Sequence, residues 1–264
     1  LMSLDAELES NMGFSKVNIE DKNIFLKNIS FSYNKDEVIF NEFNLKIESG
    51  KNLAIVGPTG SGKTTIINLL LRFYELNSGQ ILFGKYNISS LDISFLRSNI
   101  GVIHQDPFLF SDTILNNITF SNNKSRAEVL FALKDIGLMD IIDTFPNGLD
   151  SHVGEEGKNL SLGQRQLISF LRIYMSNASI IIFDEATSSL DSNTEEIIKK
   201  AINKFSEFKT CIIIAHRLST IKNADRIIFL KNGKIMEDGD HESLIAKNGF
   251  YAEYHDKQWM DYFK

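Results

Sequence analysis

The chain is organised around Gly57-Pro58-Thr59-Gly60-Ser61-Gly62-Lys63-Thr64, which fills every fixed position of the pattern G-x-x-x-x-G-K-[ST]. The apolar run 53–56 before it predicts a buried strand, and residues 65–73 after it predict a helix. Glycines let the backbone curl so that several N–H groups point inward, and a helix start adds its positive end. This order of strand, loop and helix predicts a polyphosphate site, with Lys63 reaching the β- and γ-phosphates and the Thr64 hydroxyl ligating Mg²⁺.

The composition is that of an ordinary globular protein and argues against several classes of function. The chain of 264 residues is 43% hydrophobic and 23% charged, which is enough for a sizeable core in one large domain or two small ones. A net charge of −6 argues against a nucleic-acid groove. No apolar run comes near the roughly 18 residues of a membrane span, and no signal-peptide pattern is present. The single cysteine, Cys211, is predicted to be a small core residue.

The order of the predicted elements indicates an α/β fold. Two runs of alternating residues, 23–33 and 43–48, predict an antiparallel ribbon ahead of the glycine loop. Further strands are predicted at 80–86, 99–104, 180–183, 210–215, 226–230 and 234–237. Helices are predicted at 93–97, 114–120, 126–136, 164–175, 195–205, 241–246 and 251–259. Because strands alternate with helices outside the helical stretch 106–159, we expect a mainly parallel sheet with a helical insert.

Two neighbouring acids follow one of the predicted buried strands. Asp184 and Glu185 end the apolar run 180–183. In an open α/β sheet, ligands lie beyond the carboxyl ends of the strands. Two neighbouring carboxylates at a strand end shielded from water are energetically unfavourable unless a metal ion or a proton partner is near. We therefore expect Asp184 to face Mg²⁺ through water and Glu185 to polarise an attacking water.

Other polar residues stand at strand ends or at a helix start. Gln105 follows the run 102–104, and its amide is suited to ligating Mg²⁺ or orienting water. His216 follows the strand that ends near Ala215 and is expected to contact a γ-phosphate. Ser161 is a natural N-cap, and Gly163 lets a ligand approach the same helix start. The ring of Tyr33 either stacks on a base or caps the sheet.

The order of these pieces resembles the nucleotide-binding domain of ABC transporters, over residues 19–257. The motifs that match are Gly57 to Thr64 with the Walker A loop, Gln105 with the Q-loop, Leu160 to Gln164 with the signature motif, Ile180 to Glu185 with Walker B, Ser189-Leu190-Asp191 with the D-loop, His216 with the switch histidine and Tyr33 with the adenine-stacking aromatic. The whole set in this order is far more specific than any one motif.

The resemblance implies a fold, a set of site residues and two cofactors, ATP and Mg²⁺. The implied fold is a P-loop NTPase core with a mainly parallel sheet, an N-terminal antiparallel β subdomain and a helical subdomain insert. The residues implied to contact ATP are Tyr33, Gly57, Pro58, Thr59, Gly60, Ser61, Gly62, Lys63, Thr64, Thr65, Ser161, Gly163, Gln164 and Asp191, those implied in catalysis are Glu185, His216, Lys63 and Gln105, and those implied to hold Mg²⁺ are Thr64, Gln105 and Asp184. Glu185 resembles the catalytic base.

The resemblance also implies partners. Two such domains pair head to tail, as homodimer or heterodimer, with each ATP between the Walker A loop of one and the signature of the other. Gln105 and the helical insert would face the transmembrane domains at the cytoplasmic face of the cell membrane. The sequences of 105–118 and of Val153-Gly154-Glu155 resemble those of exporters. Residues 1–20 would then be a linker after an absent transmembrane region, and 21–264 the ABC ATPase domain, with its helical subdomain at about 106–175.

One residue departs from the family pattern. The usual signature has Gly where this chain has Leu162, so a bulky side chain would stand near the partner's nucleotide. This resembles one half of heterodimeric exporters in which one composite site is weakened. Two other functions are compatible with a phosphate loop of this kind. ABC-type ATPases of DNA repair or chromosome structure carry a long coiled coil between the Q-loop and the signature, and only 105–160 is available here. A non-hydrolysing regulator would lack Glu185 or His216, and both are present.

Overall fold

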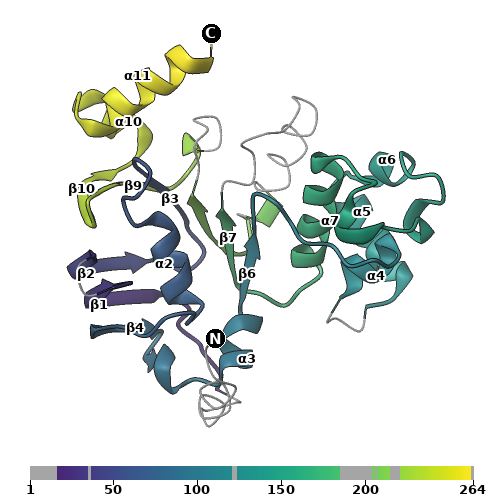
Figure 1. Cartoon of the computed structure of the whole chain (residues 1–264), viewed down its shortest axis with the longest axis horizontal. Coiled ribbons are helices and arrows are strands. Elements are labelled where there is room, and N and C mark those ends of the chain that lie inside the picture. Colours follow the sequence, from purple (N-terminus) through teal and green to yellow (C-terminus); the bar gives the residue numbers. More distant parts are fainter. Residues whose placement is uncertain are drawn as a thin grey trace.

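The computed structural model describes residues 17–34, 37–120, 124–184, 204–205, 207–214 and 221–262. Their strands form a four-stranded sheet with the order β2-β1-β4-β5 and a six-stranded sheet with the order β10-β9-β3-β8-β7-β6. The first sheet is antiparallel, whereas in the second only the pair β9–β10 is antiparallel. The predicted fold class, with a mainly parallel core sheet, an antiparallel subdomain and a helical insert, is confirmed (Figure 1).

The element bounds are as follows. The antiparallel sheet contains β1 (Ile24–Ser32), β2 (Val38–Ile47), β4 (Ser78–Phe83) and β5 (Tyr86–Asn87). The six-stranded sheet contains β3 (Asn52–Val56), β6 (Ile100–Ile103), β7 (Ile180–Asp184), β8 (Thr210–Ile214), β9 (Arg226–Lys231) and β10 (Lys234–Gly239). The α-helices are α2 (Lys63–Leu70), α3 (Ile93–Ser98), α4 (Ile114–Thr119), α5 (Arg126–Asp135), α6 (Met139–Ile142), α7 (Leu162–Tyr174), α10 (His241–Ala246) and α11 (Phe250–Tyr262), with short 3₁₀ turns at Ile88–Ser90, Gly148–Asp150 and Glu155–Gly157.

The six-stranded sheet has an apolar layer on each face. Side chains alternate along a strand, so Leu53 and Ile55 of β3 face one way while Ala54 and Val56 face the other. The first pair joins a cluster with α2 and the antiparallel sheet. The second pair joins a cluster with α7 and the helical insert, to which the fully buried Cys211 also belongs, as predicted. Figure 1 shows α2 on one side of β6 and β7 and the helical insert on the other.

Two strand boundaries differ from the prediction because of local backbone turns. The run 80–86 was expected to be one strand, but it turns back at Gly84, where φ is +61° and a Cβ would lie 2.4 Å from the carbonyl oxygen of Asp21. Strand β2 begins earlier than expected, at Val38. A bulge with Glu42 at φ +53° makes both Phe40 and Phe43 face the core, and a period of two cannot connect residues three apart.

The helical insert is a lobe beside β6 and β7 (Figure 1). Its helices α4 and α5 match the predicted runs 114–120 and 126–136, and α5 begins with a capping box formed by Ser125 and Glu128. The short helix α6 was not predicted. Most of the predicted helix 195–205 lies outside the described residues. Across the described ranges, every helix is too short or too polar to cross a membrane.

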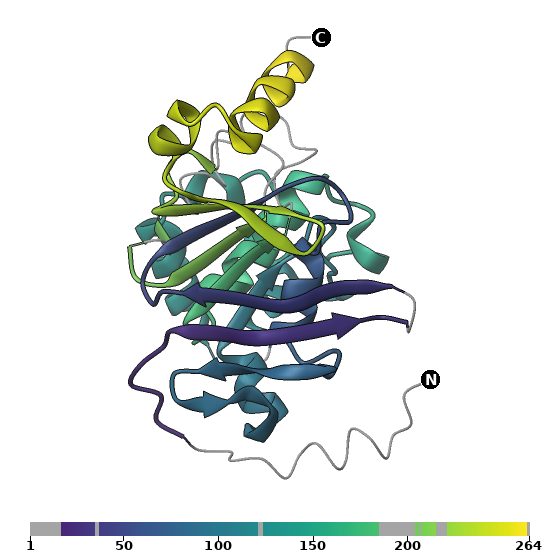
Figure 2. The ribbon, with the colours of Figure 1, turned by 90° about the vertical axis from the view of Figure 1, so that its left-hand side faces the viewer.

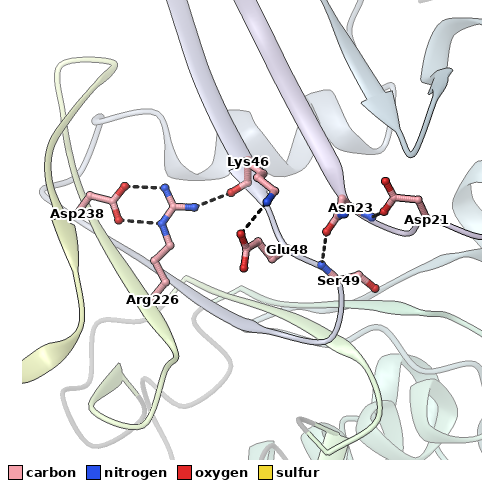
Figure 3. Close-up of polar contacts among 7 residues, drawn as sticks. All are labelled: Asp21, Asn23, Lys46, Glu48, Ser49, Arg226 and Asp238. Carbon is pink, nitrogen blue, oxygen red and sulfur yellow. Dashed lines mark hydrogen bonds and ion pairs between the residues drawn. The ribbon is translucent and has the colours of Figure 1, made fainter.

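A polar network joins the antiparallel sheet to the edge of the six-stranded sheet (Figure 3). Both arms of the Arg226 guanidinium bind the Asp238 carboxylate, at 2.8 and 2.6 Å, and this pairing raises the pKa of Arg226. The remaining nitrogen, Nη1, donates to the backbone oxygen of Lys46 at 2.7 Å. Figure 2 shows the hairpin β9–β10 directly above the ribbon β1–β2 that this contact holds.

We predict that Arg226→Met lowers the free energy of unfolding by about 1–2 kcal/mol, because a bidentate charge-assisted contact and a backbone acceptor lose their donor. Urea denaturation measures the change. Lys46→Ala is the control, since only its backbone oxygen accepts from Arg226 and its side chain forms an exposed ion pair with Glu48. It should shift stability by no more than about 0.5 kcal/mol. Equal losses in the two variants would contradict a role for the guanidinium.

Candidate active site

The glycine loop lies at the carboxyl end of β3 and depends on close backbone packing. Gly57 has φ +148°, and a Cβ there would lie 2.0 Å from the carbonyl oxygen of Leu230 in β9. Gly60, at φ +77°, has open space around the position of a Cβ. The loop is therefore pressed against the neighbouring strand at its start and exposed at its tip. This arrangement lets its backbone amides turn toward a ligand without a side chain in the way.

Lys63 begins α2 and is buried. Its side chain curls back so that Nζ donates to the carbonyl oxygens of Gly57 at 2.7 Å and Pro58 at 3.0 Å. The preceding residue, Gly62, gives α2 no side-chain cap. Beside it, the buried hydroxyl of Ser61 has no hydrogen-bond partner among the described residues. A buried cation, an orphaned hydroxyl and a helix start without a side-chain cap together fit a polyanion.

Tyr33 is hydrogen-bonded to two residues of α2. Its hydroxyl donates to Oγ1 of the buried Thr65 at 3.2 Å and accepts from Nδ2 of Asn68 at 3.2 Å. Its half-exposed ring meets Phe31 and Tyr74 edge-on, with centroids 4.9 and 5.0 Å away. The side chain of Thr65 is thus engaged with Tyr33. Thr64 is exposed at the start of α2, as a metal-binding hydroxyl requires.

The ends of β6 and β7 bring two further predicted residues to the same edge of the sheet. These strands are parallel neighbours, with Ile103 opposite Phe183. Asp184, half-buried at the end of β7, has its Oδ2 4.0 Å from Nδ1 of the exposed His104. Gln105 is exposed immediately beyond. Because the carboxyl ends of parallel strands share one edge, Asp184 and Gln105 end on the edge that carries the glycine loop.

Three predicted residues, Glu185, Asp191 and His216, lie outside the described residues. Pro58, Thr59 and Gly60 form the exposed tip of the glycine loop. The remaining predicted residues, Ser161, Gly163 and Gln164, start α7 in the helical lobe, and Figure 1 places α7 across β6 and β7 from α2. The structure therefore does not bring this second group to the glycine loop of its own chain.

The start of α7 is locked by a capping box. The hydroxyl of Ser161 accepts from the Gln164 amide at 3.1 Å, and Oε1 of Gln164 accepts from the Ser161 amide at 3.0 Å. Leu162 is half-buried and packs against the apolar cluster that contains the lobe's core. Part of the Leu162 side chain therefore packs into its own lobe.

The prediction from sequence missed two amide side chains around this region. Gln166 of α7 is 1% exposed, and its Nε2 donates to the backbone oxygen of His104 at 2.9 Å and to that of Gln105. Asn159 accepts from the Gly154 amide at 2.7 Å and donates to the His152 oxygen at 2.9 Å, which ties 152–154 to the start of α7. A signal for Gln166 exists, because it stands four residues from Phe170 on an apolar helix face where a polar residue is unexpected.

The chain is similar in sequence to known proteins. Residues 40–188 match the family model described as ABC transporter. The chain is 41% identical over 98% of its length to the "Uncharacterized ABC transporter ATP-binding protein YwjA" of Bacillus subtilis, and 43% identical over 95% of its length to a "Putative multidrug export ATP-binding/permease protein" of Staphylococcus aureus. It covers 45% and 44% of these relatives, and so spans less than half of their length.

A solved structure is similar to most of the chain. It is the structure of a bacterial Atm1-family ABC exporter with ATP bound, with a TM-score of 0.86 and 38% sequence identity. The similarity covers 92% of this chain and 43% of that one. The described fold therefore corresponds to less than half of that exporter structure.

We predict that Gly57→Ala destabilises the protein much more than Gly60→Ala. The first substitution combines a backbone conformation that only glycine adopts readily with a clash against the Leu230 carbonyl, and should lower the free energy of unfolding by more than about 2 kcal/mol. The second adds a methyl group to open space at positive φ, and should cost about 1 kcal/mol. Urea unfolding of both variants measures the difference, and similar losses would contradict the packing described.

Proposed function

The chain belongs to the ABC transporter family as one of its ATP-binding, ATP-hydrolysing domains, and on this premise we propose that it powers export of a substrate through a membrane transporter. The observation that carries the proposal is the glycine loop. A buried Lys63 and a helix start without a side-chain cap lie on the same sheet edge as Asp184. The longest described helix between Gln105 and Leu160 has 10 residues, which disfavours the coiled-coil ATPases of DNA repair.

The loop residues fit the triphosphate of ATP, and the polar groups beside them fit Mg²⁺. Lys63 and the loop amides would neutralise and hold the phosphates, while Tyr33 would stand beside the base. Thr64, Gln105 and Asp184 would hold Mg²⁺, whose charge screens the phosphate oxygens when it is bound. Glu185 would accept a proton from the attacking water, and His216 would hold the γ-phosphate end. Catalysis would then consist mostly of positioning and charge neutralisation.

We further propose that two such domains pair head to tail. Ser161, Gly163 and Gln164 stand in the lobe away from their own glycine loop, which supports contact with the ATP bound by a second domain. Leu162 is the feature that favours a heterodimer with one weakened composite site. The side chain of Leu162 is half-buried, so it adds less volume toward the partner than a fully exposed leucine would, and the weakening of that site would be smaller.

The helical lobe would contact the transmembrane domains at the cytoplasmic face of the membrane. Three aromatic side chains between Gln105 and the start of α5 support this: Phe108, Phe110 and Phe120 are 59%, 37% and 46% exposed. Phe110 stacks on Phe120 with ring centroids 4.3 Å apart, and Phe108 meets Phe110 edge-on at 5.1 Å. A cluster of exposed rings favours an interface over free solvent. The relatives are named as combined ATP-binding and permease proteins, which is consistent with such an interface.

We predict that Glu185→Gln keeps ATP affinity but lowers steady-state phosphate release by roughly 10²- to 10⁴-fold, the usual contribution of a general base. The matched control is Glu253→Gln, an exposed acid at the start of α11. It should leave turnover unchanged. ATPase activity of Glu185→Gln within a few-fold of the unmodified chain would remove Glu185 from the proposed role.

We predict that Lys63→Ala weakens ATP binding by about 10- to 100-fold, since the triphosphate loses a charge-assisted contact. A titration with a fluorescent ATP analogue measures the affinity, and circular dichroism checks that the variant is folded. Lys85→Ala, at an exposed lysine beside Tyr86, serves as the control and should bind as the unmodified chain does. Unchanged affinity in the Lys63 variant would argue against the assignment of the phosphate loop.

A further inference from the structure

Two consecutive side chains of α7 hold the segment that follows β6. The amide of Gln166 donates from Nε2 to the backbone oxygen of His104, at 2.9 Å, and to that of Gln105. The neighbouring Arg165 forms an ion pair with Asp106, with Nη2 and Oδ1 3.1 Å apart. The helix that begins with the signature residues is therefore bonded directly to the loop that carries Gln105.

The two contacts differ in their surroundings. Gln166 is 1% exposed, whereas the carboxylate of Asp106 is 82% exposed. Hydrogen bonds in a buried site are electrostatically stronger than those in water, and exposed ion pairs contribute little. Gln166 thus supplies the stronger of the two restraints on the loop.

The geometry of the Gln166 contacts fixes the backbone on both sides of Gln105. The His104 carbonyl belongs to the peptide unit before the Gln105 Cα, and the Gln105 carbonyl belongs to the unit after it. Restraining both peptide planes sets the direction of the Cα–Cβ bond of Gln105, from which its side chain extends. The residue itself is exposed.

Burial of the Gln166 amide has an unfavourable energetic contribution that an apolar side chain would not have. Its Oε1 is buried with no hydrogen-bond partner among the described residues. An unpaired buried amide oxygen is unfavourable, and methionine would fill a similar volume without it. Compared with methionine, the amide of Gln166 contributes the two hydrogen bonds that it donates to the backbone.

We propose that Gln166 is a positioning residue that orients Gln105 toward the bound nucleotide and its metal ion, and that couples the start of α7 to that site within one chain. The inference rests on the proposed ATPase function. A single helix carries both the signature residues and Gln166, so a displacement of its first turn reaches the backbone of Gln105 through two hydrogen bonds.

The first test compares Gln166→Met with the unmodified chain without nucleotide. Loss of the donors should release the loop, and the ¹⁵N order parameters of the Gln105 and Asp106 amides should fall from about 0.85 toward about 0.6. Turnover should drop about 10- to 100-fold, as is usual when a group supporting a metal ligand is removed, and half-saturating Mg²⁺ should rise. ATP affinity measured in EDTA should not change, because the glycine loop is intact. Unchanged order parameters with unchanged Mg²⁺ dependence would overturn the proposal.

A double-mutant cycle with Gln105→Ala separates positioning from general support of the fold. If Gln166 acts through Gln105, Gln166→Met should have almost no further effect on turnover in the Gln105→Ala background. Multiplicative losses would overturn the proposal. Asp106→Asn is the control for the exposed ion pair and should change turnover by less than about twofold. A loss equal to that of Gln166→Met would assign the restraint to Asp106 instead.

Failure of the proposed ATPase function and failure of the proposed role of Gln166 would give different results. Gln166→Asn keeps an amide but is one methylene too short, so it should reproduce the Gln166→Met effects if the methionine variant fails to fold. An unmodified chain with no ATPase activity would refute the proposed function. In that case the order parameters of the Gln105 loop would still show whether Gln166 holds it.

Discussion

The buried ammonium of Lys63 is the constraint on which the rest of the site depends. A charge removed from water is unfavourable unless hydrogen bonds replace its hydration. Here the carbonyls of Gly57 and Pro58 accept from it, and they point inward only because the loop is curled. The curl requires Gly57 to approach the Leu230 carbonyl, so β9 must lie beside β3. The position of one lysine is thus linked to the strand order of the core sheet.

That strand order also divides the site between two parts of the chain. The apolar clusters on the two faces of the six-stranded sheet are separate: one is shared with α2 and the antiparallel sheet, the other with the helical lobe. The groups proposed to hold phosphate therefore belong to the first part, and α7 belongs to the second. The residues at the start of α7 lie in the lobe of their own chain, away from its glycine loop, and this separation is the physical basis of the proposed head-to-tail pairing.

Local sequence was sufficient wherever one element decided the outcome. The run 53–56, the glycine loop and a helix after it were predicted, because a buried strand and a helix face each have a clear period. The helix bounds differ: α2 runs from Lys63 to Leu70, so the predicted Phe73 lies beyond its end. The break at Gly84 and the bulge at Glu42 depend on contacts with distant residues, such as the Asp21 carbonyl, that no local pattern reports. The roles of Asn159 and Gln166 were missed for the same reason, since their partners lie in loops that only the tertiary fold brings near.

Leu162 also affects the helix that carries Gln166. It stands four residues before Gln166, so both side chains lie on the same face of α7, about 6 Å apart along its axis. Leu162 anchors that face in the apolar cluster, while Gln166 bonds it to the loop of Gln105. A glycine at 162 would leave the first turn of α7 without this anchor and with greater backbone freedom. In the proposed head-to-tail pair, the leucine would bear on the chain's own nucleotide site through the rigidity of the helix, as well as on the site of a partner through its bulk.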